Sequence, residues 1–168
     1  MEITTLEQAK QVIKKWLEEN NHKITEVPDE NAMFHFEIDY PLGSMKKQRI
    51  IQPKEYPGLV VILNGVSIAP EHTERLKAWN HEEKDAFYAE IRNALIFLPN
   101  SYDFNIDEMG VARQAQFSYE FYYDALTKTK IYEGLLLNHR TLLYIIHKFN
   151  DTFGVPAMPK EQETVGNA

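Results

Sequence analysis

Apolar and polar residues recur with regular spacing along most of the chain, and this pattern predicts its helices and strands. Between Leu6 and Leu17, apolar residues return every three or four positions, as on the buried side of an amphipathic helix. The segment Thr4–Glu7 has the form of a capping box, and Asn20-Asn21 is a typical helix end. The chain is therefore expected to open with one amphipathic helix.

Strict alternation predicts strands in the next part of the chain. The clearest runs from Phe34 to Tyr40, and shorter segments at 23–27 and 46–51 favour two more strands. The continuous apolar run Leu59–Leu63 predicts a central strand that is covered on both faces. Asn64-Gly65 then favours a tight hairpin turn.

The second part of the chain alternates helical and strand patterns. Pro70 suits the first position of a helical stretch that reaches Trp79, and Asn80 with Glu83 resembles a fresh helix cap. Two alternating segments, at 102–107 and 117–123, predict a hairpin of strands. A long last helix follows from about 125 or 128 to Gly154, and its apolar residues spread beyond a single stripe.

Composition sets the class of protein. A length of 168 residues, of which 43% are hydrophobic and 12% aromatic, fits one globular domain, which we assign to residues 1–154, followed by a polar tail at 155–168. The net charge of 18 − 25 = −7 makes nucleic acid an unfavourable partner. The chain has no cysteine, no apolar stretch of spanning length and no secretory signal, so we expect a cytoplasmic protein without membrane contact.

Three potential metal ligands occupy alternate positions of one predicted strand. His35, Glu37 and Asp39 would project from the same sheet face. A small metal-dependent enzyme built on this face is the alternative function, and it needs a bound ion and a concave site. Because alternation by itself places polar residues on a solvated face, the preferred interpretation assigns no metal there.

Other motifs of enzymes and nucleic-acid proteins are incomplete. Asp103–Asp107 copies the start of a calcium loop, but Glu108 stands where the required glycine should be. Glycine-rich phosphate loops and the G-x-S-x-G nucleophile motif do not occur. The basic residues Lys46, Lys47 and Arg49 are more typical of a charged edge strand than of an RNA platform, which ranks last. The sequence therefore predicts neither a catalytic residue nor a cofactor.

A surplus of apolar residues on the hairpin and the last helix indicates a partner or a second buried layer. Tyr122, Leu136, Leu137 and Tyr144 lie outside the main apolar stripes and are the predicted binding residues. The competing interpretation is a helix packed between two layers of its own domain. Self-association and peptide binding remain open alongside it.

The order helix, three to four strands, helix, two strands, helix resembles the type III secretion chaperone-like fold, an α+β domain with a twisted antiparallel sheet and flanking helices. The chain also resembles an uncharacterised prokaryotic family, a domain of unknown function placed in that fold group. The resemblance rests on the first helix ending at Trp16-Leu17, the strand 56–62, the segment 66–72 and the aromatic hairpin before Leu135–Phe149.

This resemblance implies a fold and a homodimer but no catalytic residues. Secretion chaperones dimerise and hold segments of other proteins, and a shared fold extends that activity to this chain only by analogy. The sequence as a whole predicts a non-enzymatic, chaperone-like module that binds itself and a protein or peptide.

Overall fold

The computed structural model describes residues 3–157. Its elements in chain order are α1 (Leu6–Glu19), β1 (Thr25–Glu26), β2 (Ala32–Asp39), β3 (Lys47–Pro53), β4 (Leu59–Ser67), α2 (Pro70–Lys77), α3 (His81–Leu95), β5 (Ser101–Ile106), β6 (Ala112–Tyr122), a short 3-10 turn (Tyr123–Ala125) and α4 (Lys128–Phe153). This is the predicted order of elements, and it confirms an α+β fold.

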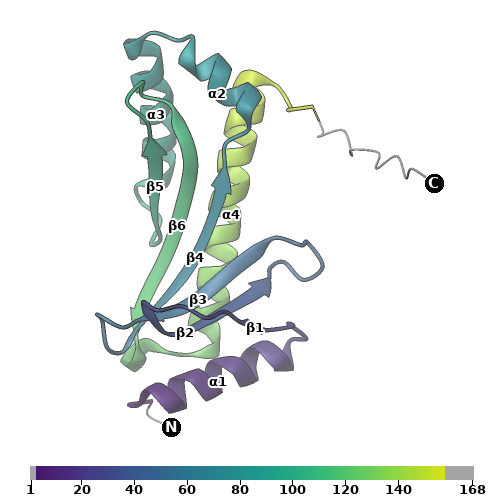
Figure 1. Cartoon of the computed structure of the whole chain (residues 1–168), viewed down its shortest axis with the longest axis vertical. Helices are drawn as coiled ribbons and strands as arrows, with labels where there is room; N and C mark the ends of the chain where they lie inside the picture. Colours follow the sequence, from purple (N-terminus) through teal and green to yellow (C-terminus); the bar gives the residue numbers. More distant parts are fainter. Residues whose placement is uncertain (1–2, 158–168) are drawn as a thin grey trace, which may run out of the picture.

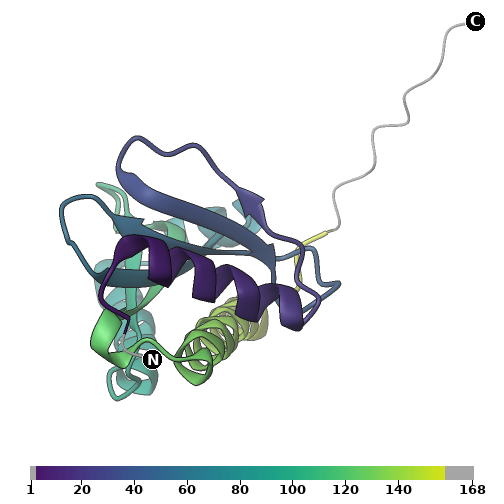
Figure 2. The ribbon, with the colours of Figure 1, turned by 90° about the horizontal axis from the view of Figure 1, so that it is seen from below.

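The strands form one six-stranded sheet in the order β1-β2-β3-β4-β6-β5, and every neighbouring pair is antiparallel. The helices pack behind the sheet in the view of Figure 1, and the view from below in Figure 2 shows strands in one layer and helices α1 and α4 in another. β4 and β6 are long and run beside α4 over much of the molecule. The opposite face of the sheet is turned toward the reader in Figure 1.

Two apolar cores lie between the sheet and the helices. The first core joins α1 to β2, β3 and one end of β4, with Ile13, Phe36 and Ile62 fully buried. The second core joins α2 and α3 to β6, with Phe87, Phe117 and Phe149 buried. α4 crosses both cores, which explains its broad apolar surface: different turns of the helix bury different sides. The interpretation of a helix packed within its own domain therefore accounts for most of that surface.

Buried amides separate the two cores. Asn138 of α4 donates to the Ile62 carbonyl at 2.9 Å, and its own side-chain oxygen accepts from Asn100 at 3.1 Å. Gln48 of β3 donates to the Leu135 carbonyl at 2.8 Å. These bonds tie α4 to the sheet at the point where apolar contacts change from one core to the other.

The helix caps are largely as the sequence indicates. Asn80 and Glu83 form the predicted capping box of α3. At α1 the cap is Thr5 with Gln8, one position after the predicted pair, because the side-chain amide of Gln8 can accept from the backbone in place of a carboxylate. The helix ends at Asn20 as expected.

The predicted hairpin turn at Asn64-Gly65 is wrong. β4 continues through both residues, and Gly65 pairs with Gln116 of β6. A Cβ at Gly65 would lie 3.1 Å from the Ala115 carbonyl oxygen, so glycine permits close approach of two strands here. The Asn64 side chain accepts from the Gly65 N–H at 2.8 Å.

Between residues 3 and 157, no helix combines the length and the apolarity needed to cross a membrane. The assignment of a tail at 155–168 falls mostly on residues 158–168, which lie outside the described part of the chain.

Candidate functional site

The uncovered face of the sheet carries a set of side chains defined by strand register. All four α-helices contact the other face, so the residues that alternate with the core residues point away from the helices. One row across the strands is His35, Ile51, Val61 and Glu120, and the next is Glu37, Arg49, Leu63 and Ser118. We call this surface the open face.

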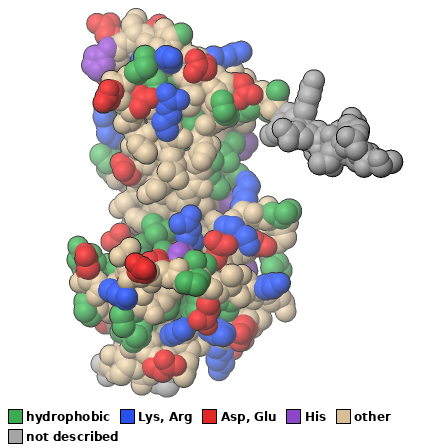
Figure 3. Space-filling model, in the orientation of Figure 1, with side chains coloured by type: hydrophobic (Ala, Val, Ile, Leu, Met, Phe, Trp, Pro, Cys, Tyr) green, Lys and Arg blue, Asp and Glu red, His purple; other side chains and the backbone are tan. Residues whose placement is uncertain are grey.

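The centre of the open face is apolar. Ile51, Leu59 and Val61 are 9% exposed or less, although the helices lie on the other face of the sheet. Tyr122 and Tyr56 stand beside them and are 56% and 55% exposed. Figure 3 shows this side of the molecule, with hydrophobic side chains among charged ones over the lower strands.

A depression of about 610 Å³ lies at this apolar centre. Leu59 and Val61 of β4 line it, together with Tyr122 of β6, with Pro53 at the end of β3 and with Tyr56 in the turn before β4. Tyrosines present large, rigid contact surfaces that lose little conformational entropy when they bind, and they are enriched at the centres of interfaces. The depression can accept apolar side chains of a partner, and Glu120 at its margin supplies a hydrogen-bond acceptor.

The three potential metal ligands share the open face, as alternation predicts, but each contacts another partner. His35 Nδ1 lies 2.9 Å from Asp29 Oδ2, and Lys47 Nζ lies 2.8 Å from Asp39 and 3.9 Å from Glu37. The Asn31 N–H, and after it His35, lower the pKa of Asp29. Within residues 3–157, no group of three His, Cys, Asp or Glu side chains is arranged to hold a metal ion. The geometry therefore gives the metal-enzyme alternative no support.

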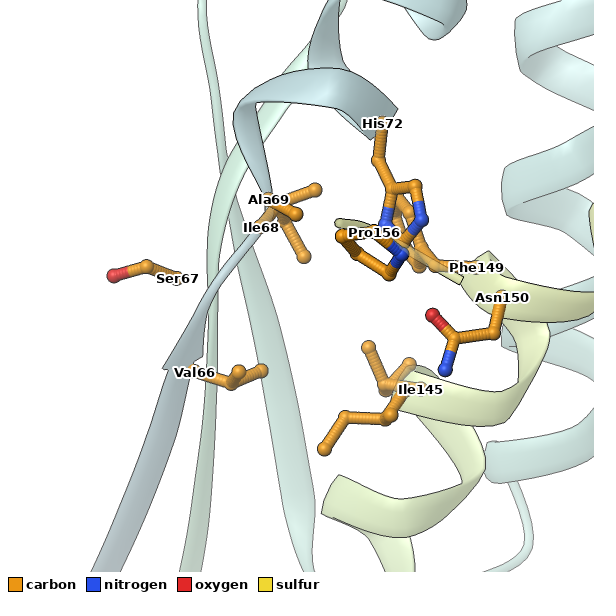
Figure 4. A pocket seen from close by; sticks show the side chains of 10 residues that line it. Val66, Ser67, Ile68, Ala69, His72, Ile145, Phe149, Asn150 and Pro156 are labelled. Atoms are coloured by element: carbon orange, nitrogen blue, oxygen red, sulfur yellow. The ribbon is translucent and has the colours of Figure 1, made fainter. Parts of the chain in front are cut away.

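A second hollow lies between the end of β4, the start of α2 and the last turns of α4 (Figure 4). It measures about 180 Å³ and is lined mainly by apolar side chains, among them Val66, Ile145 and Phe149. Pockets for small ligands usually measure about 300–1,000 Å³, so this hollow is too small for most of them. His72 beside it donates from Nε2 to the Gly154 carbonyl at 2.7 Å. This bond supplies a partner for a backbone carbonyl at the C-terminal end of α4.

The four predicted binding residues are not brought together. Tyr122 lines the depression on the open face, whereas Leu136, Leu137 and Tyr144 belong to α4 on the other side of the sheet. Leu136 is exposed, Leu137 packs against the first core and Tyr144 packs against the second. A binding surface that contains Tyr122 thus differs from one that contains the α4 residues.

The sequence interpretation missed the residues around Tyr122. Leu59–Leu63 was expected to be a central strand covered on both faces, and its side chains are buried on both faces, but Leu59 and Val61 line the depression on the face opposite the helices. The signal was present as apolar residues on both sides of β4 together with Tyr56 shortly before it. Alternation of apolar and polar residues does not reveal which face of the sheet the helices cover.

Comparison with known proteins places the chain in a family. The family described as uncharacterized conserved protein (DUF2299) matches residues 9–149. The chain belongs to the DUF2299 family. None of the curated proteins matches it.

Two solved structures share the DUF2299 fold seen here. The crystal structure of an uncharacterized protein from Methanothermobacter thermautotrophicus is similar with a TM-score of 0.80 and 27% identity, over 87% of this chain and 99% of that one. The crystal structure of YbjN from E. coli, described as a candidate transcription regulator, is similar with a TM-score of 0.50 and 9% identity, over 85% of this chain and 92% of that one. The expected uncharacterised prokaryotic family and the expected chaperone-like α+β fold are both confirmed.

Proposed function

We propose that this protein is a non-enzymatic binding module that associates with a second copy of itself and holds an extended segment of another protein on the open face. The observation that carries the peptide-binding part is the apolar depression between Tyr56 and Tyr122, on the sheet face opposite the helices. An apolar centre flanked by exposed tyrosines and bordered by polar groups is a common composition of a protein-binding surface.

The shape and charge of the open face favour an extended ligand. Residues of both β4 and β6 line the depression, so a segment with apolar side chains at alternate positions could place one beside Val61 and the next beside Leu59. Arg49 and Glu37 lie in the next row across the sheet and can pair with polar groups of that segment. Such pairs contribute more to specificity than to affinity.

The test uses a phage library of random dodecapeptides, selected against the purified full chain. Selected sequences should carry apolar or aromatic residues at alternate positions. A labelled peptide from this selection should bind the Tyr122→Ser variant at least tenfold more weakly, a loss of about 1.4 kcal/mol. Fluorescence anisotropy measures the affinity.

The matched control is Leu136→Ser, which removes an exposed apolar side chain from α4. This variant should bind the peptide as the original chain does. Failure to select any peptide, or loss of binding in Leu136→Ser with full binding in Tyr122→Ser, would contradict the assignment to the open face. Because both side chains are exposed, thermal melting should show that both variants remain folded.

A further inference from the structure

β5 forms a free edge of the sheet, and Asp103 is its only charged residue. It is the outermost strand beyond β6 and has six residues, Ser101–Ile106. Natural edge strands are commonly shortened or carry lysine or proline, which discourages a second chain from pairing. β5 contains no lysine, arginine or proline.

The register of the sheet identifies which backbone groups of β5 point outward. Hydrogen bonds from Ile68 N to Arg113 O and from Tyr123 N to Gly58 O show that odd-numbered residues of β6 exchange hydrogen bonds with β4. By alternation, even-numbered residues of β6 face β5, where Ser118 and Gln116 pair with Ser101 and Asp103. The outward N–H and C=O groups of β5 are therefore those of Tyr102, Phe104 and Ile106.

These outward groups match a second copy of the same strand. A twofold axis through Phe104 pairs Phe104 with its own copy, and Tyr102 with Ile106 of the second copy, so every outward group gains a partner. Asp103 then faces Asn105 of the second copy on the open face. An axis through Asp103 would instead place two carboxylates opposite each other, which destabilises a strand pair.

The same twofold axis creates complementary charge on α3. The Tyr88 ring packs against Phe104 with ring centroids 5.7 Å apart, so the middle of α3 lies beside the middle of β5. Asp85 and Arg92 are both exposed and lie three residues before and four residues after Tyr88, about two helical turns apart. In an antiparallel pair of α3 helices, Asp85 of each copy meets Arg92 of the other, and Ala89 between them permits close approach.

We propose that a second copy of this chain binds along β5 and α3 and forms a continuous twelve-stranded sheet. This inference rests on the proposed self-association and names its surface. The pairing covers Ile106, which is 45% exposed in the single chain, with Tyr102 of the second copy. The open face stays free for a peptide, because the second copy extends the sheet sideways.

The experiment is sedimentation velocity on the full chain over a micromolar concentration range. The original chain should form a dimer of about twice 19.6 kDa. Arg92→Glu should raise the dissociation constant at least tenfold, since it places two acidic side chains opposite each other. The double variant Asp85→Lys, Arg92→Glu should restore the dimer. Arg140→Glu, an exposed charge reversal on α4, is the matched control and should leave the dimer unchanged.

Amide hydrogen exchange supplies a readout of the strand pairing itself. In the dimer, the N–H groups of Tyr102, Phe104 and Ile106 should become protected, and dilution to monomer should expose them while Asp103 stays protected by β6.

Three outcomes would overturn the inference. A monomeric original chain would overturn it together with the proposed self-association. A dimer that ignores Arg92→Glu and leaves Phe104 unprotected would overturn only the β5 surface, and a double variant that stays monomeric would contradict the antiparallel α3 pair. The peptide experiment on the open face is independent of all three.

Discussion

The two cores of this protein are built from similar side chains but leave different surfaces uncovered. Around the first core the sheet is wide, because β1, β2 and β3 extend it beyond β4, and α1 packs on it. Around the second core the sheet narrows to β4, β6 and β5, since β3 pairs with β4 only at Val61–Leu63. Two helices, α2 and α3, cover this narrower part.

The edges of the sheet show what this difference means for association. β1 has only two residues, and Glu26 on it contacts Lys10 and Lys14 of α1 at 3.1 and 3.5 Å, so charged side chains protect that edge. β5 is three times as long and has outward backbone groups and apolar side chains. The first half of the molecule therefore protects its edge, and the second half offers an edge for pairing.

The largest expected effects come from removing one aromatic ring from each core. Phe36→Ala and Phe149→Ala should each lower the free energy of unfolding by about 3–5 kcal/mol, because each leaves a cavity among buried side chains. Urea denaturation measures the loss. If the halves are one cooperative unit, both variants should lower hydrogen-exchange protection in both cores.

A loss of protection confined to one core would show that the two cores are not one cooperative unit. If Phe149→Ala lowered protection only around α2 and α3, the second half would unfold separately and the cores would be independent units. The control is Asn93→Ala on the exposed side of α3, which should change stability by no more than about 0.5 kcal/mol.

An intermediate effect is expected at the amides between the cores. Asn138→Ala should lower the free energy of unfolding by about 1–3 kcal/mol, because it removes the bond to the Ile62 carbonyl and one partner of Asn100. Asn100 retains its bond to Thr141 at 2.9 Å, which limits the cost. Urea denaturation measures the loss, and an unchanged slope of the free energy of unfolding against urea concentration would show that the halves still unfold together. If the variant lost no stability, the amides would not join the cores.

Much of this architecture could be predicted from the sequence, because apolar periodicity is a direct consequence of one-sided burial. Alternation in β2 correctly placed Phe34, Phe36 and Ile38 in the core. The capping box at Asn80 correctly located the start of α3. These features depend on residues close together in the chain, so no knowledge of distant contacts was needed.

The candidate site was harder to predict because it depends on contacts between distant segments. Asn64-Gly65 is chemically suited to a turn, but the extended pairing of β4 with β6 outweighs that local preference. The surplus apolar residues of α4 favour a binding surface by pattern alone, whereas in the structure most of them are used because the helix crosses two cores. Tyr122 was predicted as a binding residue, but Val61 comes beside it only through the register of β4 with β6, and Tyr56 through the turn that precedes β4.

The smallest expected effect is a pH dependence of stability that arises in the first half of the molecule and not in the second. Burial, and to a lesser degree Lys46, lowers the pKa of His139 below its usual 6.5, and its ring packs edge-on against Tyr40 beside the first core. Because the folded chain binds this proton more weakly than the unfolded chain, stability falls as the pH drops below the unfolded pKa toward the lower folded one. Replacing His139 by Gln should make the free energy of unfolding, measured by urea denaturation, fall less between pH 7.5 and pH 5, by about a few tenths of a kcal/mol, given the partial exposure of the ring. The control is Asn93→Ala on the exposed side of α3 in the second half, which replaces no titratable group and should leave the slope of stability against pH unchanged. An equal response of both variants would show that the pH dependence does not arise from burial at the first core.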